Sequence, residues 1–516
     1  MMRKKWLLVT VLVVFAAACF LSGCAQGDQE TKEKDTVAQE LVIGIGRDFY
    51  NGPESSNFVH GSTGVWESLT YLNENLEPVM QLAEKITSDD TKKVWTVTLR
   101  QGIKFHDGTT LNADAVIKSA MRLKENLEFD EYGTFLDLEK VEAAGDNVVV
   151  FTYNHPEPAF PAKVAYHGCP IFSLNSFDAE GNLTHPYGTG PFKFEEYKKD
   201  DALILTRNDD YWGTKPKLTK VIFKVIPDPA TRLAALKTGE IHAIADVGGV
   251  LPEQASDIKG DDDLVLHSQA VTTSHYIIFN NQKPPFNDQK LRQAVSLSID
   301  RSQLVEIVLS GYGDPTSSIF TPLAKEWVAT GLWKTDKEKA KELAGQVKLQ
   351  KPEKVSLVVS SALANRWPYK PIAEIIQSEL KEYGLDVEIE MMEAGAWSEA
   401  LKSGNYHMSL SPYTLMTGDP DFYFGRWIYS EGQMNTTRGL GYKSSEADKL
   451  VLDAARETDN AKRKALYQDL QKLVAEDVPV APIFNDISLY AVRKEVKGLQ
   501  LDPFFKPSLE KVWLSE

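Results

Sequence analysis

His167 and Cys169 lie two residues apart, and an imidazole beside a thiol is a pair that can supply a base and a nucleophile. The sequence shows no third group to orient the histidine, so an unreactive thiol explains Cys169 better. The zinc motif H-E-x-x-H, the Walker A phosphate loop and the G-x-S-x-G elbow are absent, and the nine histidines lack metal-site spacing. We therefore expect a protein that is not an enzyme and has no cofactor of its own.

Acidic residues outnumber basic residues by 73 to 57 over the 516 residues, which gives a formal net charge of −16. A surface of that sign repels phosphate, so nucleic acid is excluded as a partner. The chain is long enough for two to four domains, and 42% apolar residues are typical of a globular protein. Three cysteines are too few for a disulfide-stapled scaffold.

The N-terminus has the pattern of an export signal. Three basic residues, 3–5, precede fifteen uncharged residues, 6–20, a run that suits the apolar region of a signal peptide better than a permanent membrane helix. The following Leu-Ser-Gly-Cys at 21–24 resembles a bacterial lipobox, whose cysteine becomes the lipidated N-terminus. A cleaved signal with an incidental cysteine is the alternative. We predict a signal peptide over 1–23 and lipidation of Cys24, which places the protein outside the cytoplasm, anchored to the cell membrane.

The rest of the chain reads as a polar tether followed by an α/β body. Residues 24–40 carry too little apolar surface to fold, so they are predicted to be a flexible tether. Residues 372–383 have the spacing of an amphipathic helix that ends at Gly384, and strand-like residues lie before it at 355–360 and after it at 385–389. This strand–helix–strand unit predicts a parallel sheet. Further strands are predicted at 41–45, 94–99 and 148–153, and helices at 291–299 and at 447–476 with a break near 459–460.

Nine segments together resemble the large bacterial extracellular solute-binding proteins of the dipeptide, oligopeptide and nickel type. They include V-W-E-S-L, G-T-G-P-F and N-D-D-Y-W-G, and the set spans the chain from about residue 41 to the C-terminus. The matching segments are residues 65–69, 75–78, 95–109, 188–192, 208–213, 226–232, 238–241, 291–294 and 299–301. As a set they are specific for the family and only weakly specific for the ligand.

The resemblance implies an α/β, two-lobed periplasmic-binding-protein-like fold of type II with a hinge. It places lobe I at 41–278 with an extra subdomain at about 75–185, lobe II at 279–484, and a return to lobe I at 485–516. The hinge crossings are expected near 279–280 and 484–485. The ligand is enclosed between the lobes and delivered to the permease subunits of an ABC importer. We expect a monomer that contacts the membrane through its anchor alone.

The ligand is the open question, because a peptide-type position is altered. Peptide-binding members hold the peptide's amino group with an aspartate shortly before a Gly-x-Pro loop of lobe II. A gapless match places Met416 there, and a thioether cannot neutralise an ammonium ion. Asp419 or Asp421 takes over that role only if the loop shifts, and Gly-Asp-Pro-Asp is otherwise an ordinary turn.

Three features resemble nickel-type members, which take the metal as a small chelate. His60 lies in the loop before the V-W-E-S-L segment and is suited to contact the metal. His167 falls near a chelate-binding arginine of those proteins, and Arg426 is placed to clamp a carboxylate. Tyr413 and Trp427 are the expected aromatic contacts. Ordinary structural roles remain the alternative for each of these residues.

The sequence also departs from the nickel type, because the Arg-x-x-Trp pair expected after Arg122 is missing. The pocket, and with it the chelator, must therefore differ. We expect nickel, or another transition metal held by a small chelator, as the transported ligand. A dipeptide or oligopeptide is the alternative.

Overall fold

The computed structural model describes residues 38–49, 63–125, 133–165, 169–350 and 352–516. The chain divides into a unit of residues 1–38 and a unit of residues 39–516, and the fold below is that of the second unit. The signal peptide, Cys24 and most of the predicted tether lie outside the described residues. In the part of the chain that is described, no helix has both the length and the apolar character needed to span a membrane.

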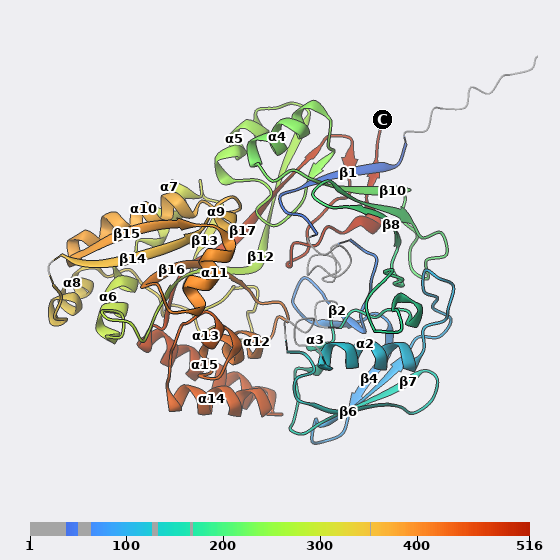
Figure 1. Ribbon diagram of the computed structural model, residues 1–516, viewed down its shortest axis with the longest axis horizontal. Helices are drawn as coiled ribbons and strands as arrows, with labels where there is room; N and C mark the ends of the chain where they lie inside the picture. The colour runs from blue at the N-terminus through green and yellow to red at the C-terminus, as the bar shows by residue number, and fades with distance from the viewer. Residues whose placement is uncertain (1–37, 50–62, 126–132, 166–168, 351) are drawn as a thin grey trace, which may run out of the picture. The chain divides into compact units, whose positions relative to one another are not determined.

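Two long strands connect the two halves of the described chain. β12 (Leu264–Phe279) and β17 (Val480–Arg493) run antiparallel beside each other in a mixed sheet (Figure 1). Near its C-terminal end β17 pairs with β11 (Ala243–Ile244), whereas residues 273–279 of β12 pair with β16 (Met408–Thr414). Within the described residues this sheet has eleven strands. Ten of them follow the order β15 (Leu385–Met392), β14 (Glu353–Ser360), β16, β12, β17, β11, β1 (Glu40–Ile45), β10 (Lys220–Val225), β9 (Ala202–Arg207) and β8 (Phe192–Lys198), and β13 (Gly313–Pro315) pairs with β17. The two strands therefore carry the chain from one lobe to the other.

The register between β12 and β17 shifts between Ala270 and Ser274. Beyond this irregularity, residues 273–279 of β12 pair with β16, a strand of lobe II, and the crossing near 279–280 stays a prediction. On β17, Asn485 pairs with Ser274, close to the predicted second crossing near 484–485.

Lobe I contains the half of the sheet around β1, where the predicted strand 41–45 is confirmed. β1 is parallel to β10 and β11, and α4 connects the latter two. Asp228 caps α4 by accepting the Thr231 N–H, and Gly239 ends it in the left-handed conformation. The elements are β1 (Glu40–Ile45), β8 (Phe192–Lys198), β9 (Ala202–Arg207), β10 (Lys220–Val225), α4 (Pro229–Thr238), β11 (Ala243–Ile244), η3 (Pro252–Gln254), α5 (Ala255–Lys259), β18 (Val496–Lys497), η6 (Leu509–Lys511) and β19 (Trp513–Leu514).

A second, antiparallel sheet lies within the range expected for the subdomain, about 75–185, and has its own apolar core. Its order is β4-β5-β7-β6, and it confirms the predicted strands 94–99 and 148–153. Phe151, Phe160 and the fully buried thiol of Cys169 belong to this core. The elements are β2 (Thr70–Leu72), β3 (Pro78–Met80), β4 (Ala83–Ser88), β5 (Val94–Leu99), α2 (Ala113–Glu125), β6 (Leu138–Ala143), β7 (Val148–Tyr153), α3 (Phe160–Lys163) and η2 (Leu174–Ser176).

Lobe II contains the predicted strand–helix–strand unit. β14 (Glu353–Ser360) is parallel to β15 (Leu385–Met392), α10 connects them, and Gly384 has the left-handed conformation expected of a C-cap. The second predicted helix is two helices, α14 and α15, because Asp459 caps a new N-terminus by accepting the Lys462 N–H.

The predicted α/β architecture is thus confirmed. The other elements of lobe II are α6 (Gln289–Ser298), α7 (Arg301–Val308), α8 (Lys337–Gln346), α9 (Ser361–Ala364), α10 (Tyr369–Leu380), η4 (Lys381–Tyr383), α11 (Ala394–Lys402), β16 (Met408–Thr414), α12 (Asp421–Tyr423), η5 (Phe424–Ile428), α13 (Gln433–Thr437), α14 (Ser445–Arg456) and α15 (Asn460–Asp477).

His106 makes the stability of this fold depend on pH. Its Nε2 lies 2.9 Å from the Gly190 carbonyl oxygen, so the neutral ring donates through Nε2–H. Burial lowers the pKa of His106 to about 4, from 6.5 in an unfolded chain. The folded protein therefore resists the proton that the unfolded chain accepts. The contribution of His106 is complete above pH 6.5, and it is lost as the pH falls from 6.5 toward 4.

We expect acidification from pH 7 to pH 4.5 to reduce the free energy of unfolding by about 2.4 kcal/mol through this one residue. Urea unfolding of the wild type and of His106→Gln at both pH values measures it. The variant should lose less stability on acidification than the wild type, and equal losses would contradict the assignment.

Candidate functional site

Several of the segments that resemble the solute-binding family meet around one buried carboxylate, that of Glu67. Its oxygens accept hydrogen bonds from Thr189 Oγ1 at 2.7 Å, from the Tyr211 hydroxyl at 2.9 Å and from Trp212 Nε1 at 2.7 Å. Burial raises the pKa of Glu67. These contacts join residues that lie more than 120 positions apart. The segments therefore hold lobe I together, which explains why they say little about the ligand.

The stretch from the end of β16 to η5 contains five of the seven predicted site residues. Tyr413 and Trp427 pack edge to face, with ring centres 5.5 Å apart. The Tyr413 hydroxyl donates to the Phe422 carbonyl oxygen at 2.8 Å, so it orders this stretch from within. The indole N–H of Trp427 is buried and donates to none of the described residues. It is a donor available to a ligand or a water molecule.

Arg426 and Met416 belong to the same stretch, and both contact other residues of lobe II. The Arg426 guanidinium lies 5.0 Å from the centre of the Phe422 ring and also donates to the Gln433 side-chain oxygen. Met416 is half-buried and packs against the apolar core of the lobe. Tyr413, Trp427 and Arg426 are thus brought together, while Met416 contributes no charge.

The two acidic residues of this stretch both have basic partners. Asp419 accepts from both terminal nitrogens of Arg463, at 2.6 and 2.8 Å, in a buried bidentate pair. Asp421 lies 3.1 Å from Nζ of Lys163, which belongs to α3 of lobe I. Neither carboxylate is therefore left over to neutralise a ligand ammonium group.

His60 and His167 lie outside the described residues, so their predicted contacts stay predictions. Among the residues that are described, no group of three or more His, Cys, Asp or Glu side chains could hold a metal ion. A chelated metal brings its own donors and needs no such cluster.

Sequence reasoning missed a pair of arginines at the hinge end of the interface between the lobes. Arg47 follows β1 in lobe I, and Arg366 follows β14 in lobe II. Arg47 lies 3.6 Å from Asp246, whose carboxylate also accepts the backbone N–H groups of Gly46 and Val247. The Nε of Arg47 is buried without a partner in the described chain. The acceptor capacity of Asp246 is thus shared among several donors.

The guanidinium of Arg366 is the less satisfied of the two. Its Nε lies 3.3 Å from the Val247 carbonyl oxygen and the group stacks over Trp367, yet it forms no ion pair with any described residue. Burial and the nearby charge of Arg47 lower its pKa to about 9, although Asp246 and Asp486 oppose this shift. Asp486 already accepts from Trp367 Nε1 at 3.0 Å. Two guanidinium groups from opposite lobes are therefore placed to bind an anion.

A signal for these arginines was present in the sequence. Ligands of open α/β sheets bind outside the carboxyl ends of parallel strands, and Arg47 lies two residues beyond the predicted strand 41–45. Arg366 lies six residues beyond 355–360, with the short helix α9 between. The side to which each points depends on the tertiary structure.

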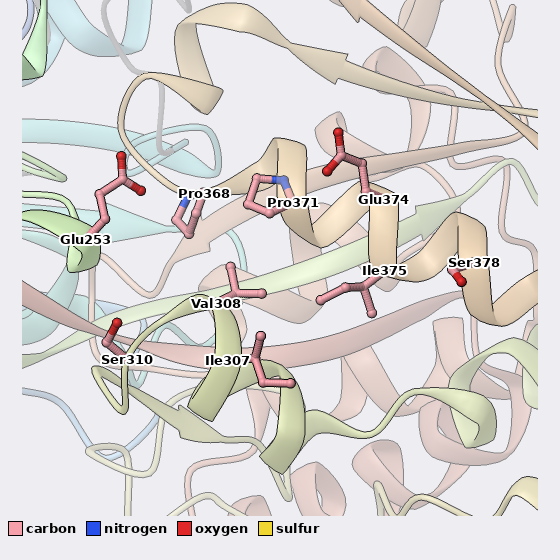
Figure 2. A pocket seen from close by; sticks show the side chains of 9 residues that line it. All are labelled: Glu253, Ile307, Val308, Ser310, Pro368, Pro371, Glu374, Ile375 and Ser378. Carbon is pink, nitrogen blue, oxygen red and sulfur yellow. The ribbon is translucent and has the colours of Figure 1, made fainter.

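The groove shown in Figure 2 suits an anion less well. It has a volume of about 480 Å³, lies between α7 and α10, and is lined by Ile307, Val308 and Ile375. Its charged side chains, Glu253 and Glu374, are both acidic, so they would repel a carboxylate. None of the predicted site residues lines it. Another cavity, of about 420 Å³, lies between the β2–β3 turn and the loop that contains Asp419.

Comparison with known proteins identifies the family of this chain. The model for bacterial extracellular solute-binding proteins, family 5 (middle region), matches residues 77–435. The probable D,D-dipeptide-binding periplasmic protein DdpA of Escherichia coli is 30% identical and covers 84% of this chain and 83% of its own. The oligopeptide-binding protein AppA of Bacillus subtilis is 28% identical over the whole length of both chains.

A solved structure supports the fold. NikA from Brucella suis, in complex with Fe(III)-EDTA, superimposes with a TM-score of 0.82 over 92% of this chain and all of its own. Because the sequences are only 21% identical, this similarity supports the two-lobed fold alone.

Proposed function

Because this chain belongs to the bacterial extracellular solute-binding proteins of family 5, which are receptors of ABC importers and not enzymes, we propose that it captures a carboxylate-bearing chelate of nickel or a related transition metal. The chelate binds between the lobes and favours their closure, because it contacts both lobes only when they are closed. Lipidation of Cys24 holds the receptor at the outer face of the cell membrane, beside the permease that accepts the cargo.

The distribution of charge along the interface between the lobes supports this proposal most directly. Arg366 has guanidinium nitrogens without an ion-pair partner in the described chain, and Arg47 joins it from the other lobe. The stretch from the end of β16 to η5, in contrast, has Met416 in the place of an amine-binding aspartate. Its two acidic residues, Asp419 and Asp421, are paired with Arg463 and Lys163. This balance favours a ligand with carboxylates and no uncompensated ammonium group.

A short peptide is the second candidate. Several relatives, DdpA and AppA among them, are peptide-binding proteins. A peptide also carries a carboxylate, which would suit Arg366 and Arg47. The ammonium group of such a peptide would nevertheless find no unpaired carboxylate in the stretch from the end of β16 to η5, because Asp419 and Asp421 already have basic partners.

A thermal-shift panel on the full-length protein in detergent separates the candidates. We expect Ni(II) with L-histidine to raise the melting temperature, whereas di- to pentapeptides leave it unchanged. Binding to the folded state alone contributes about 2.7 kcal/mol at a hundredfold excess over Kd, which is readily detected. Stabilisation by peptides and not by the nickel complex would refute the chelate.

The same thermal-shift panel includes a variant that tests the metal contact. We propose that His60 touches the bound metal, so His60→Ala should weaken the response to Ni(II)–histidine without lowering the melting temperature of the ligand-free protein. L-histidine alone and Ni(II) alone are the ligand controls. An unchanged Kd for the variant by calorimetry would remove His60 from the site.

A further inference from the structure

The lobes also touch at a second place, distant in sequence from the hinge strands. We call it the rim contact and define it by Leu76 and Lys163 of lobe I and Gly418 and Asp421 of lobe II. Gly418 has φ of +66°, and a Cβ there would lie 2.8 Å from Leu76 Cβ and 3.2 Å from the Leu76 carbonyl oxygen. Only a glycine lets the two backbones approach so closely. Leu76 is 8% exposed and joins an apolar cluster made mainly of lobe II residues.

An ion pair accompanies this packing. Nζ of Lys163 lies 2.7 Å from Glu157 within lobe I and 3.1 Å from Asp421 across the interface. The side chains of Lys163 and Asp421 are only 17% and 15% exposed. Burial opposes both charges, yet attraction to its two carboxylates raises the pKa of Lys163, and the bases near Asp421 lower the pKa of that carboxyl. Both groups are therefore charged where the lobes meet.

The rim contact bears on loop 416–421 of lobe II, which contains Gly418, Asp419 and Asp421. The Asp421 N–H donates to Asp419 Oδ1 at 2.9 Å, and Asp419 is bound by Arg463 of α15. The loop is thus held from within lobe II by Arg463. Leu76 and Lys163 hold it from lobe I.

We propose that Leu76 and Lys163 are positioning residues for loop 416–421, which they order only when the lobes meet. The rim contact adds to the stability of the closed state independently of any cargo contact. Weakening it therefore reduces the fraction of closed protein, and the apparent affinity falls by the same factor. The proposal holds for any cargo taken between the lobes, so it does not depend on the nickel chelate.

Hydrogen exchange of the ligand-free, full-length protein in detergent tests it without a cargo. The reporter is the β2–β3 turn, where the Leu76 N–H bonds to the Asn73 carbonyl oxygen at 2.9 Å. Gly418→Ala lies on the opposite lobe, and we expect it to speed exchange of the 73–77 amides at least tenfold. Gly311→Ala is the matched control, because Gly311 has φ of +81° and open space around its Cβ position.

Lys163→Met is a second variant that tests the proposal independently, should Gly418→Ala fold poorly. We expect faster exchange of the amides of loop 418–422, which lies on the lobe that the substitution does not touch. Lys224→Met, which breaks the Lys224–Glu240 ion pair inside lobe I, should leave that loop unchanged. Unaltered exchange at 418–422 in Lys163→Met would overturn the proposal, as would equal effects of each variant and its control.

Discussion

Replacing Arg366 with glutamine is expected to weaken binding of the Ni(II)–histidine complex about a hundredfold. A hydrogen-bonded charge pair contributes roughly 1.5–3 kcal/mol, and each 1.4 kcal/mol is a factor of ten in Kd. The guanidinium of Arg366 forms no ion pair among the described residues, so a ligand carboxylate is the partner that the substitution removes. Isothermal titration calorimetry of wild type and variant gives the ratio of Kd values.

The same substitution should not destabilise the ligand-free protein. Burial lowers the pKa of Arg366 to about 9, which means that the fold disfavours its charge, so a neutral side chain should leave the melting temperature unchanged or raise it. A loss of binding together with a gain in stability identifies a group retained for function. Arg456→Gln, at an exposed position of α14, is the matched control and should alter neither quantity. Wild-type affinity in Arg366→Gln would exclude the arginine pair from the site.

Replacing Glu67 with alanine is expected to lower the free energy of unfolding by about 3 kcal/mol or more. The substitution leaves Thr189, Tyr211 and Trp212 without the acceptor that they share. Thr189 is fully buried, and a buried donor left unpaired costs about 1–3 kcal/mol, to which the lost bonds of the half-buried Tyr211 and the exposed Trp212 add. Urea unfolding at pH 7 measures the change.

Glu84→Ala, at an exposed position of β4, should stay within about 0.5 kcal/mol of wild type. If Glu67→Ala were as mild as this control, the carboxylate would not be the centre of the lobe I scaffold. Calorimetry with the nickel complex adds a second comparison, because a scaffold residue should affect stability far more than affinity.

Local sequence patterns were enough to predict the elements of this fold. Alternation over 94–99 and 148–153 and the helix that ends at Gly384 depend on neighbours within a few residues, so a window of the chain contains the information. The break between α14 and α15 was visible for the same reason, since Asp459 caps the second helix by a bond three residues away.

The candidate site was harder to predict, because its contacts join distant segments. Asp419 was a candidate ligand contact if its loop shifted, and in the structure it pairs with Arg463, 44 residues later. Lys163 drew no attention in the sequence, although it reaches Asp421 from the other lobe. An ion pair across an interface leaves no periodicity in either segment, so neither pairing had a local signal.

By itself the sequence determined the family, the lobes, the order of helices and strands and the expectation of an exported, lipid-anchored receptor. These follow from segments whose spacing along the chain is enough to identify them. The tertiary structure alone decided which charged side chains are paired within the protein, as Asp419 is with Arg463, and which have no ion-pair partner among the described residues, as Arg366 has none. The charge available at a site depends on every partner within a few ångströms, and those partners come from parts of the chain that only folding brings together.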